Sequence, residues 1–152
     1  MKIVQIGTGG WGKNHTRILS ELGVLVAVCD ADPQKSKEYG EKYSVNHYTS
    51  LDELLSAEEF DGAFVVTPTS THTAITQKLL EAKKHVFVEK PMTYKSEDGQ
   101  NLVKIAEKNK VILTCGYIER FNPAVGVVKK MVKEKRYVHL VMLDVHIKKK
   151  QK

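Results

Sequence analysis

The residues with the clearest chemical potential are the glycines of the segment GTGGWG near the start of the chain. Gly7, Gly9 and Gly12 form the pattern G-x-G-x-x-G. In this pattern the first glycine permits a tight turn, the second permits close approach of the backbone to a pyrophosphate, and the third permits close contact between a helix and a strand. The pattern alone is weak evidence, so the elements around it decide its meaning.

Asp30 stands 23 positions after Gly7, at the end of the next apolar run. A carboxylate there accepts hydrogen bonds from ribose hydroxyls and repels a 2′-phosphate. Ala31 and Asp32, which follow, supply no cation for such a phosphate, so the sequence favours NAD over NADP. A simple helix-capping role for Asp30 remains the alternative.

The segment Glu89-Lys90-Pro91 follows a later apolar run. A lysine at the end of a buried strand is costly unless its charge has a use, and its ammonium can hold a substrate hydroxyl or move its proton. From the residues alone, catalysis by Lys90 and a structural ion pair with Glu89 are equally good interpretations.

Predicted strands and predicted helices alternate along the chain, and they would position these residues. Helical spacing or capping signals predict helices over residues 11–22 and 33–43, a short helix after a capping box at residues 50–53, and helices from about residues 70, 96 and 123. Short apolar runs between them predict strands at residues 2–6, 25–29, 45–48, 62–67, 86–89 and 111–115.

The predicted fold class is α/β, a doubly wound parallel sheet of the Rossmann type. Strands that are apolar on both faces belong in a parallel sheet covered by helices, and ligands of such sheets bind at the carboxyl ends of the strands. Residues 1–121 are predicted to form this domain. Residues 122–152 are predicted to add a helix and a strand at 138–147, which needs a partner because isolated strand edges favour association.

Composition limits the other classes of function. Residues 1–128 hold 15 Lys and Arg against 16 Asp and Glu, whereas residues 129–152 hold 9 against 2, so the net charge of +6 belongs to the tail. This disfavours a nucleic-acid face, for which strongly salt-dependent binding would be the signature. We expect a cytoplasmic protein without a signal peptide or membrane span, structural roles for Cys29 and Cys115, and no metal site.

The chain resembles the Gfo/Idh/MocA family of oxidoreductases. The resemblance rests on the glycine turn, on the segment TPTSTH from Thr67 to His72 and on Glu89-Lys90-Pro91, in that order, and it extends over residues 1 to about 147. The segment GYIERFNP at residues 116–123 is similar to the branch that acts on nucleotide-linked amino sugars, such as UDP-N-acetylglucosamine or its uronate. That branch often has histidine at the position of Tyr117.

The resemblance implies an NAD site and a substrate end beside it. Lys90 would be the catalytic lysine and would face the substrate together with Tyr117, Arg120 and Asn122, although Asn122 is equally well interpreted as a helix cap, and His72 as an exposed residue of a first helical turn. The candidate cofactor contacts are Gly7, Thr8, Gly9, Gly10, Trp11, Gly12, Asp30, Thr67, Pro68, Thr69, His72, Glu89, Lys90 and Arg120.

Family members continue into a large, mostly antiparallel sheet that supplies most of the sugar pocket, whereas this sequence ends about one strand into it. Two interpretations follow. In the first, the chain is the NAD-binding domain of a sugar or nucleotide-sugar dehydrogenase and is weak or inactive alone, with a separate chain as one source of the missing sheet. In the second, it is a non-catalytic NAD(H)-binding module that dimerises through its terminal strand. Hydride transfer requires the substrate to be held close to the nicotinamide, so we expect little turnover by the chain alone.

Overall fold

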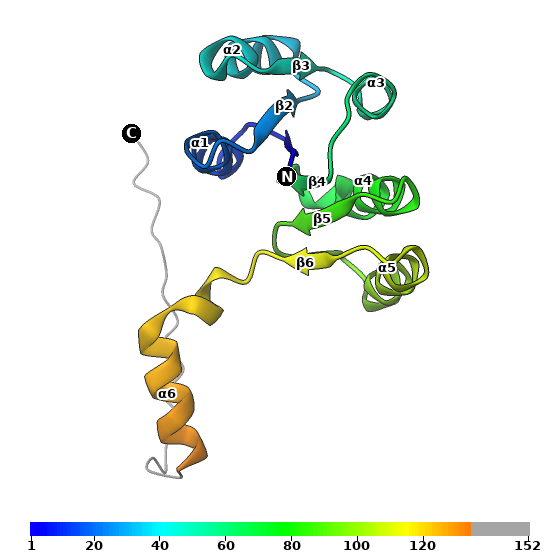
Figure 1. The fold of residues 1–152 in the computed structure, drawn as a ribbon. Helices are drawn as coiled ribbons and strands as arrows, with labels where there is room; N and C mark the ends of the chain where they lie inside the picture. The colour runs from blue at the N-terminus through cyan, green and yellow to red at the C-terminus, as the bar shows by residue number, and fades with distance from the viewer. Residues whose placement is uncertain (135–152) are drawn as a thin grey trace, which may run out of the picture. The chain divides into compact units, whose positions relative to one another are not determined.

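The computed structural model describes residues 1–134, and Figure 1 shows the order of the elements. The strands are β1 (Ile3–Ile6), β2 (Leu25–Cys29), β3 (Asn46–Tyr48), β4 (Gly62–Val65), β5 (His85–Val88) and β6 (Leu113–Cys115). The helices are α1 (Gly12–Glu21), α2 (Pro33–Tyr43), α3 (Leu51–Ala57), α4 (Thr69–Glu81), α5 (Ser96–Asn109), the 3-10 helix η1 (Ile118–Phe121) and α6 (Pro123–Lys133).

The six strands form one parallel sheet in the order β3-β2-β1-β4-β5-β6. The chain first builds outward from β1 to β3 and then returns to the other side of β1 with β4. Helices on opposite faces follow from this reversal, because right-handed crossovers in opposite directions place their helices on opposite sides. The predicted doubly wound sheet is confirmed, and its switch point lies between β1 and β4.

Two hydrophobic layers enclose the sheet. On one face, α1 and α2 pack over the strands β1 to β3 (Figure 1). Leu19 of α1 joins Ile3, Leu25 and Val28 there in one buried cluster. On the other face, a larger cluster joins residues of the strands to residues of α3, α4 and α5; its fully buried members include Val4, Val65, Val88, Leu54, Leu79 and Leu80. Alternate residues of each central strand therefore face opposite layers.

The helix starts agree with the capping signals in the sequence, with one correction. Asp32 caps α2 by accepting hydrogen bonds from the N–H groups of Gln34 and Lys35, with Pro33 in the first turn. Ser50 caps α3 through the N–H of Asp52 at 3.2 Å. A capping box would instead use the N–H of Glu53, and no such bond forms among the described residues, so this feature is a single cap.

Several strands are shorter than predicted. β4 ends at Val65 and β5 ends at Val88, so Thr67 and Glu89 lie in the loops that follow the strands. Ligands of parallel sheets bind in such loops, just beyond the carboxyl ends of the strands. No helix in the described part of the chain has the length and hydropathy needed to cross a membrane.

The chain divides into two compact units, Met1–Tyr117 and a second that begins at Ile118. The boundary lies four residues before the predicted one, which followed residue 121. In the second unit, Asn122 caps α6 by accepting a hydrogen bond from the N–H of Ala124 at 3.0 Å, as one of its two interpretations predicted. The predicted strand at residues 138–147 lies outside the described residues.

Candidate functional site

The glycine turn links β1 to α1 at the switch point of the sheet. Gly7 has φ +86°, a conformation that side chains rarely adopt, and a Cβ there would lie 2.6 Å from the Val66 carbonyl oxygen. A Cβ on Gly12 would overlap the Gly7 carbonyl oxygen, whereas a Cβ on Gly9 or Gly10 would meet nothing within 4 Å. The first and third glycines are therefore required by packing, and the middle pair borders open space.

Asp30 holds the glycine turn against the end of β2. Its Oδ2 atom accepts hydrogen bonds from both the N–H and the hydroxyl of Thr8, each at 2.8 Å, and its Oδ1 atom accepts one from the N–H of Asp32 at 3.0 Å. A carboxylate has about four lone-pair sites, so Oδ1 keeps capacity for a further donor. The turn, β2 and the loop before α2 thus meet at one carboxylate.

This setting keeps Asp30 ionised. Partial burial acts to raise the pKa of the Asp30 carboxyl, but the hydrogen bonds from Thr8 and Asp32 and the nearby Lys35 ammonium hold that pKa below its usual value. The carboxylate is thus a fixed negative charge at neutral pH.

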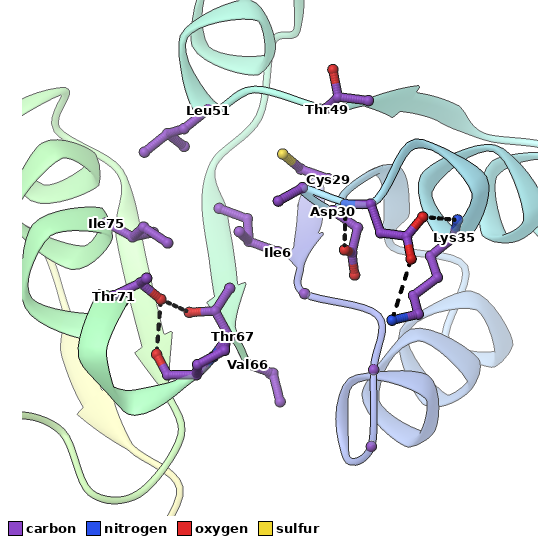
Figure 2. Close-up of a pocket in the computed structure, with 16 residues that line it drawn as sticks. Ile6, Cys29, Asp30, Lys35, Thr49, Leu51, Val66, Thr67, Thr71 and Ile75 are labelled. Atoms are coloured by element: carbon purple, nitrogen blue, oxygen red, sulfur yellow. Dashed lines mark hydrogen bonds and ion pairs between the residues drawn. The ribbon is translucent and has the colours of Figure 1, made fainter.

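A pocket of about 660 Å³ opens between the carboxyl ends of β1, β2 and β4. Figure 2 shows Thr67 and Thr71 on the α4 side, Asp30 and Lys35 on the opposite side, and the apolar Leu51 and Ile75 near one end. Of the predicted cofactor residues, the pocket lining includes Gly7, Gly9, Gly10, Asp30, Thr67 and Pro68. The strand ends at the switch point therefore border a pocket, as expected from the topology of the sheet.

Lys35 corrects one step of the sequence reasoning. Ala31 and Asp32 supply no cation near Asp30, but the first turn of α2 brings the Lys35 ammonium to the pocket wall, 3.5 Å from Asp32 Oδ2 (Figure 2). This exposed ion pair directs the ammonium towards Asp32. The predicted preference for NAD over NADP therefore continues to rest on the fixed Asp30 carboxylate, which would repel a 2′-phosphate.

Other lining residues were also missed from sequence. Val66 and Thr49 directly follow β4 and β3, so the rule that ligands bind beyond strand ends could have found them. Thr71 and Ile75 lie one helical turn apart on α4, and only the rotation of that helix in the fold turns them into the pocket.

Lys90 lies outside this pocket, in the loop after β5. Its side chain is exposed, so the expected cost of burying the lysine does not arise. Glu89 does not pair with the Lys90 ammonium among residues 1–134; its Oε2 atom accepts the Lys90 backbone N–H at 2.9 Å, and its Oε1 atom lies 3.1 Å from Nε2 of His15. The Lys90-Pro91 peptide bond is cis.

His72 is buried, contrary to the alternative of an exposed first-turn residue. Its side chain is 1% exposed, and its ring nitrogens lie 2.8 Å from the carbonyl oxygens of Pro91 and Thr67. It joins the loop after β4 to the loop after β5 and is not among the lining residues of the pocket.

The remaining predicted residues lie either near the start of α1 and α4 and at the end of the first unit, or in the second unit. Thr8 is buried under the turn, and Trp11 is 59% exposed at the start of α1. Thr69 begins α4, Tyr117 ends the first unit, and Arg120 lies in η1 of the second unit with Asn122 directly after it. Among residues 1–134, no group of three or more His, Cys, Asp or Glu side chains is arranged to hold a metal.

The two cysteines differ in exposure. Cys29 is buried beside Asp30 in the pocket wall, and burial together with the charges of Asp30 and Glu53 raises its pKa to about 11. Cys115, for which the sequence predicts a structural role, is only partly covered at the end of β6.

This difference predicts selective alkylation. The thiolate is the reactive form, so at pH 8 roughly a thousandth of the Cys29 thiol is reactive. Iodoacetamide should label Cys115 at least tenfold faster than Cys29, as measured by mass spectrometry of tryptic peptides, and urea should remove the difference. Equal labelling of both cysteines in the folded chain would contradict the buried position of Cys29.

The glycine turn, Asp30 and the pocket form one nucleotide-sized site, and comparison with known families agrees with it. Residues 1–117 match the Gfo/Idh/MocA oxidoreductase family, NAD-binding Rossmann fold. The chain belongs to this family. The Gfo/Idh/MocA match covers the whole of the first unit, which is accordingly an NAD-binding Rossmann domain.

Relatives in the Gfo/Idh/MocA family include sugar and cyclitol dehydrogenases. UDP-N-acetylglucosamine 3-dehydrogenase of Acidithiobacillus ferrooxidans is 31% identical over 125 residues, which cover 82% of this chain and 39% of the relative. Myo-inositol 2-dehydrogenase of Thermotoga maritima is 32% identical over 125 residues, which cover 80% and 37%.

Solved structures of the family have the same fold. The WlbA dehydrogenase of Chromobacterium violaceum, in complex with NADH and UDP-GlcNAcA, superimposes with a TM-score of 0.83 at 30% identity, covering 91% of this chain and 41% of that one. The chain therefore spans about two fifths of the length of these relatives.

Proposed function

We propose that the chain holds NAD(H) in the pocket at the switch point and supports hydride exchange with a secondary hydroxyl of a sugar or nucleotide sugar. The observation that carries this proposal is the Asp30 carboxylate, fixed by Thr8 and Asp32 beside a turn whose Gly9 and Gly10 border open space. A dinucleotide requires both features, a backbone that a pyrophosphate can approach and an acceptor for ribose hydroxyls.

The groups around the pocket match the parts of NAD. The N–H groups of Gly9, Gly10 and Trp11 have no hydrogen-bond partner within residues 1–134 and lie at the start of α1, a position that favours a phosphate. Asp30 Oδ1 would accept a ribose hydroxyl, and the apolar end formed by Leu51 and Ile75 would cover the adenine.

Lys90 is the proposed catalytic residue. NAD, when bound, supplies the hydride acceptor. The exposed Lys90 side chain would act as a neutral amine that accepts the proton of the substrate hydroxyl during oxidation, and in the reverse direction its ammonium would return that proton to the carbonyl oxygen. Tyr117, Arg120 and Asn122 are the proposed sugar contacts, although the Asn122 side chain is already used to cap α6.

The names of the relatives support the proposed substrate class. Their names include dehydrogenases of UDP-N-acetylglucosamine, glucose 6-phosphate and inositols, all of which carry ring secondary hydroxyls. The part of the relatives that this chain matches includes the cofactor groups and Lys90. We infer that these 152 residues, assayed alone, bind the cofactor well and oxidise such substrates slowly.

A turnover assay tests this role of Lys90. NADH formation from NAD and UDP-N-acetylglucosamine should be slow, and Lys90→Ala should lower it at least a hundredfold, since acid–base groups contribute about 10²–10⁴-fold. Lys104→Ala, which changes an exposed lysine on α5, is the matched control and should keep the rate. An unchanged rate in Lys90→Ala would contradict the assignment.

A binding module without catalysis is the second candidate. It is favoured by the pocket itself, because all of its lining residues lie within the first unit. Tight NADH binding with no turnover of any sugar nucleotide, in the presence or absence of added partner chains, would support this candidate over the first.

A further inference from the structure

We propose that His15 is a positioning residue for Lys90 and acts through the carboxylate of Glu89. This inference rests on the proposed role of Lys90 in the site. His15 lies in the first turns of α1 and Glu89 follows β5, so the two residues are 74 positions apart in sequence and meet only in the fold.

The Glu89 carboxylate bridges a helix and a loop. Its Oε1 atom lies 3.1 Å from Nε2 of His15, and its Oε2 atom accepts the backbone N–H of Lys90 at 2.9 Å. The side chains of His15 and Glu89 are 17% and 12% exposed, so water competes weakly for these bonds. One carboxylate thus connects α1 to the residue that carries the proposed catalytic amine.

The surroundings leave this carboxylate little freedom. A Cβ on Gly116 would lie 2.8 Å from Oε1 and 3.0 Å from Oε2 of Glu89. The carboxylate therefore occupies space that is free only because residue 116 is glycine. On the other side, the His15 ring packs against Phe64 and Phe87 with ring centroids 5.6 and 5.5 Å away. These contacts fix the imidazole on the sheet, and hence the Glu89 oxygen that it meets.

The connection also reaches the cofactor turn. α1 begins at Gly12, at the end of the glycine turn, and the His15 N–H bonds to the Trp11 carbonyl at 3.3 Å. Movement of the turn when a pyrophosphate binds would therefore pass through one helical turn to His15, Glu89 and the Lys90 backbone. Within residues 1–134, Glu89 is the side chain that joins α1 to the Lys90 backbone through such a pair of contacts.

Solution NMR of the 152-residue chain tests this inference without requiring turnover. In His15→Ala, the Lys90 amide signal should move upfield and its hydrogen exchange should accelerate about tenfold or more, as expected when a bond to a charged acceptor loosens. The amides of Val86 and Val88 within β5 report whether the sheet is intact. Arg17→Ala, which breaks an exposed pair with Glu21 on the same helix, should leave the Lys90 amide unchanged.

Two further variants separate positioning from general damage. His15→Gln retains an N–H donor and should restore most of the Lys90 signal. Gly116→Ala leaves His15 in place but crowds the carboxylate, and should disturb the Lys90 amide in the same direction. An unaltered Lys90 amide in both His15→Ala and Gly116→Ala would overturn the inference.

NADH addition separates this inference from the proposed function. In the wild-type chain NADH should shift the Lys90 amide, and in His15→Ala that shift should be lost while NADH still binds within about threefold of the wild-type affinity. Failure of the wild-type chain to bind NADH would refute the proposed function, and the ligand-free variants would still decide the role of His15.

Discussion

Gly12→Ala is expected to lower the free energy of unfolding by about 3 kcal/mol or more and to abolish measurable NADH binding. The added Cβ would overlap the Gly7 carbonyl oxygen, a backbone atom that cannot rotate away as a side chain does. Relief requires α1 to move off β1, which opens packing between Leu19 and Ile3. Overpacking of this kind costs about 1–3 kcal/mol even when side chains can adjust. Urea unfolding followed by circular dichroism measures the loss.

Gly10→Ala is the matched control in the same turn. Its Cβ would meet nothing within 4 Å and its φ is not in the left-handed region, so the urea midpoint should change little. The Cβ of Gly9→Ala would also meet no protein atom within 4 Å. This variant should still weaken NADH binding, because Gly9 is the glycine that a pyrophosphate approaches. Equal stability of Gly12→Ala and Gly10→Ala would show that the turn is not packed as described.

Asp30→Asn is expected to weaken NADH binding at least tenfold and to reduce the preference for NADH over NADPH. Both carboxylate oxygens accept backbone N–H groups, from Thr8 and from Asp32, so either orientation of an amide places its NH₂ against one of these donors. Bonds to charged acceptors are worth about 1.5–3 kcal/mol, and the free energy of unfolding should fall by a similar amount. Parallel titrations with NADH and NADPH measure the change in preference.

The loss in Asp30→Asn should depend on pH in a defined direction. Because the folded state holds the pKa of Asp30 below its usual value, the carboxylate stabilises the fold above the unfolded pKa of about 4 and loses this effect as pH falls through the folded pKa. The stability difference between wild type and Asp30→Asn should therefore be constant near neutral pH and shrink below about pH 4.

Asp32→Asn is the control for charge removal beside the same pocket. Asparagine caps helices about as well as aspartate, so α2 should keep its start and the urea midpoint should stay near that of wild type. A similar loss of cofactor preference in both variants would mean that total negative charge, and not the position of Asp30, sets the selectivity.

The order of elements was predictable because each strand and helix carries a local signal. The alternation of strands and helices was predicted from the apolar runs, from Asp32-Pro33 and from the glycine turn. The parallel sheet was predicted because the strands are apolar on both faces. Strand ends were less predictable. The runs ending at Thr67 and Glu89 continue past the last paired residues, because the sequence pattern does not show where pairing stops.

Contacts between distant elements could not be predicted from the sequence. The position of Ile75 in the pocket wall depends on the rotation of α4, and the bond between His15 and Glu89 depends on how α1 lies on the sheet. The burial of His72 depends on two loops that meet around it. Periodicity describes a face of a single element, whereas these features require two elements to be placed against each other.

Titration of Trp11 fluorescence with NADH tests NAD(H) binding at the switch point most directly. Trp11 is the single tryptophan, is 59% exposed and lies in the glycine turn, so a bound dinucleotide should quench its emission. We predict saturable quenching by NADH, with a much weaker response to NADPH because Asp30 repels a 2′-phosphate. No saturable response to either nucleotide, or equal affinity for both, would contradict an NAD-selective site in this pocket.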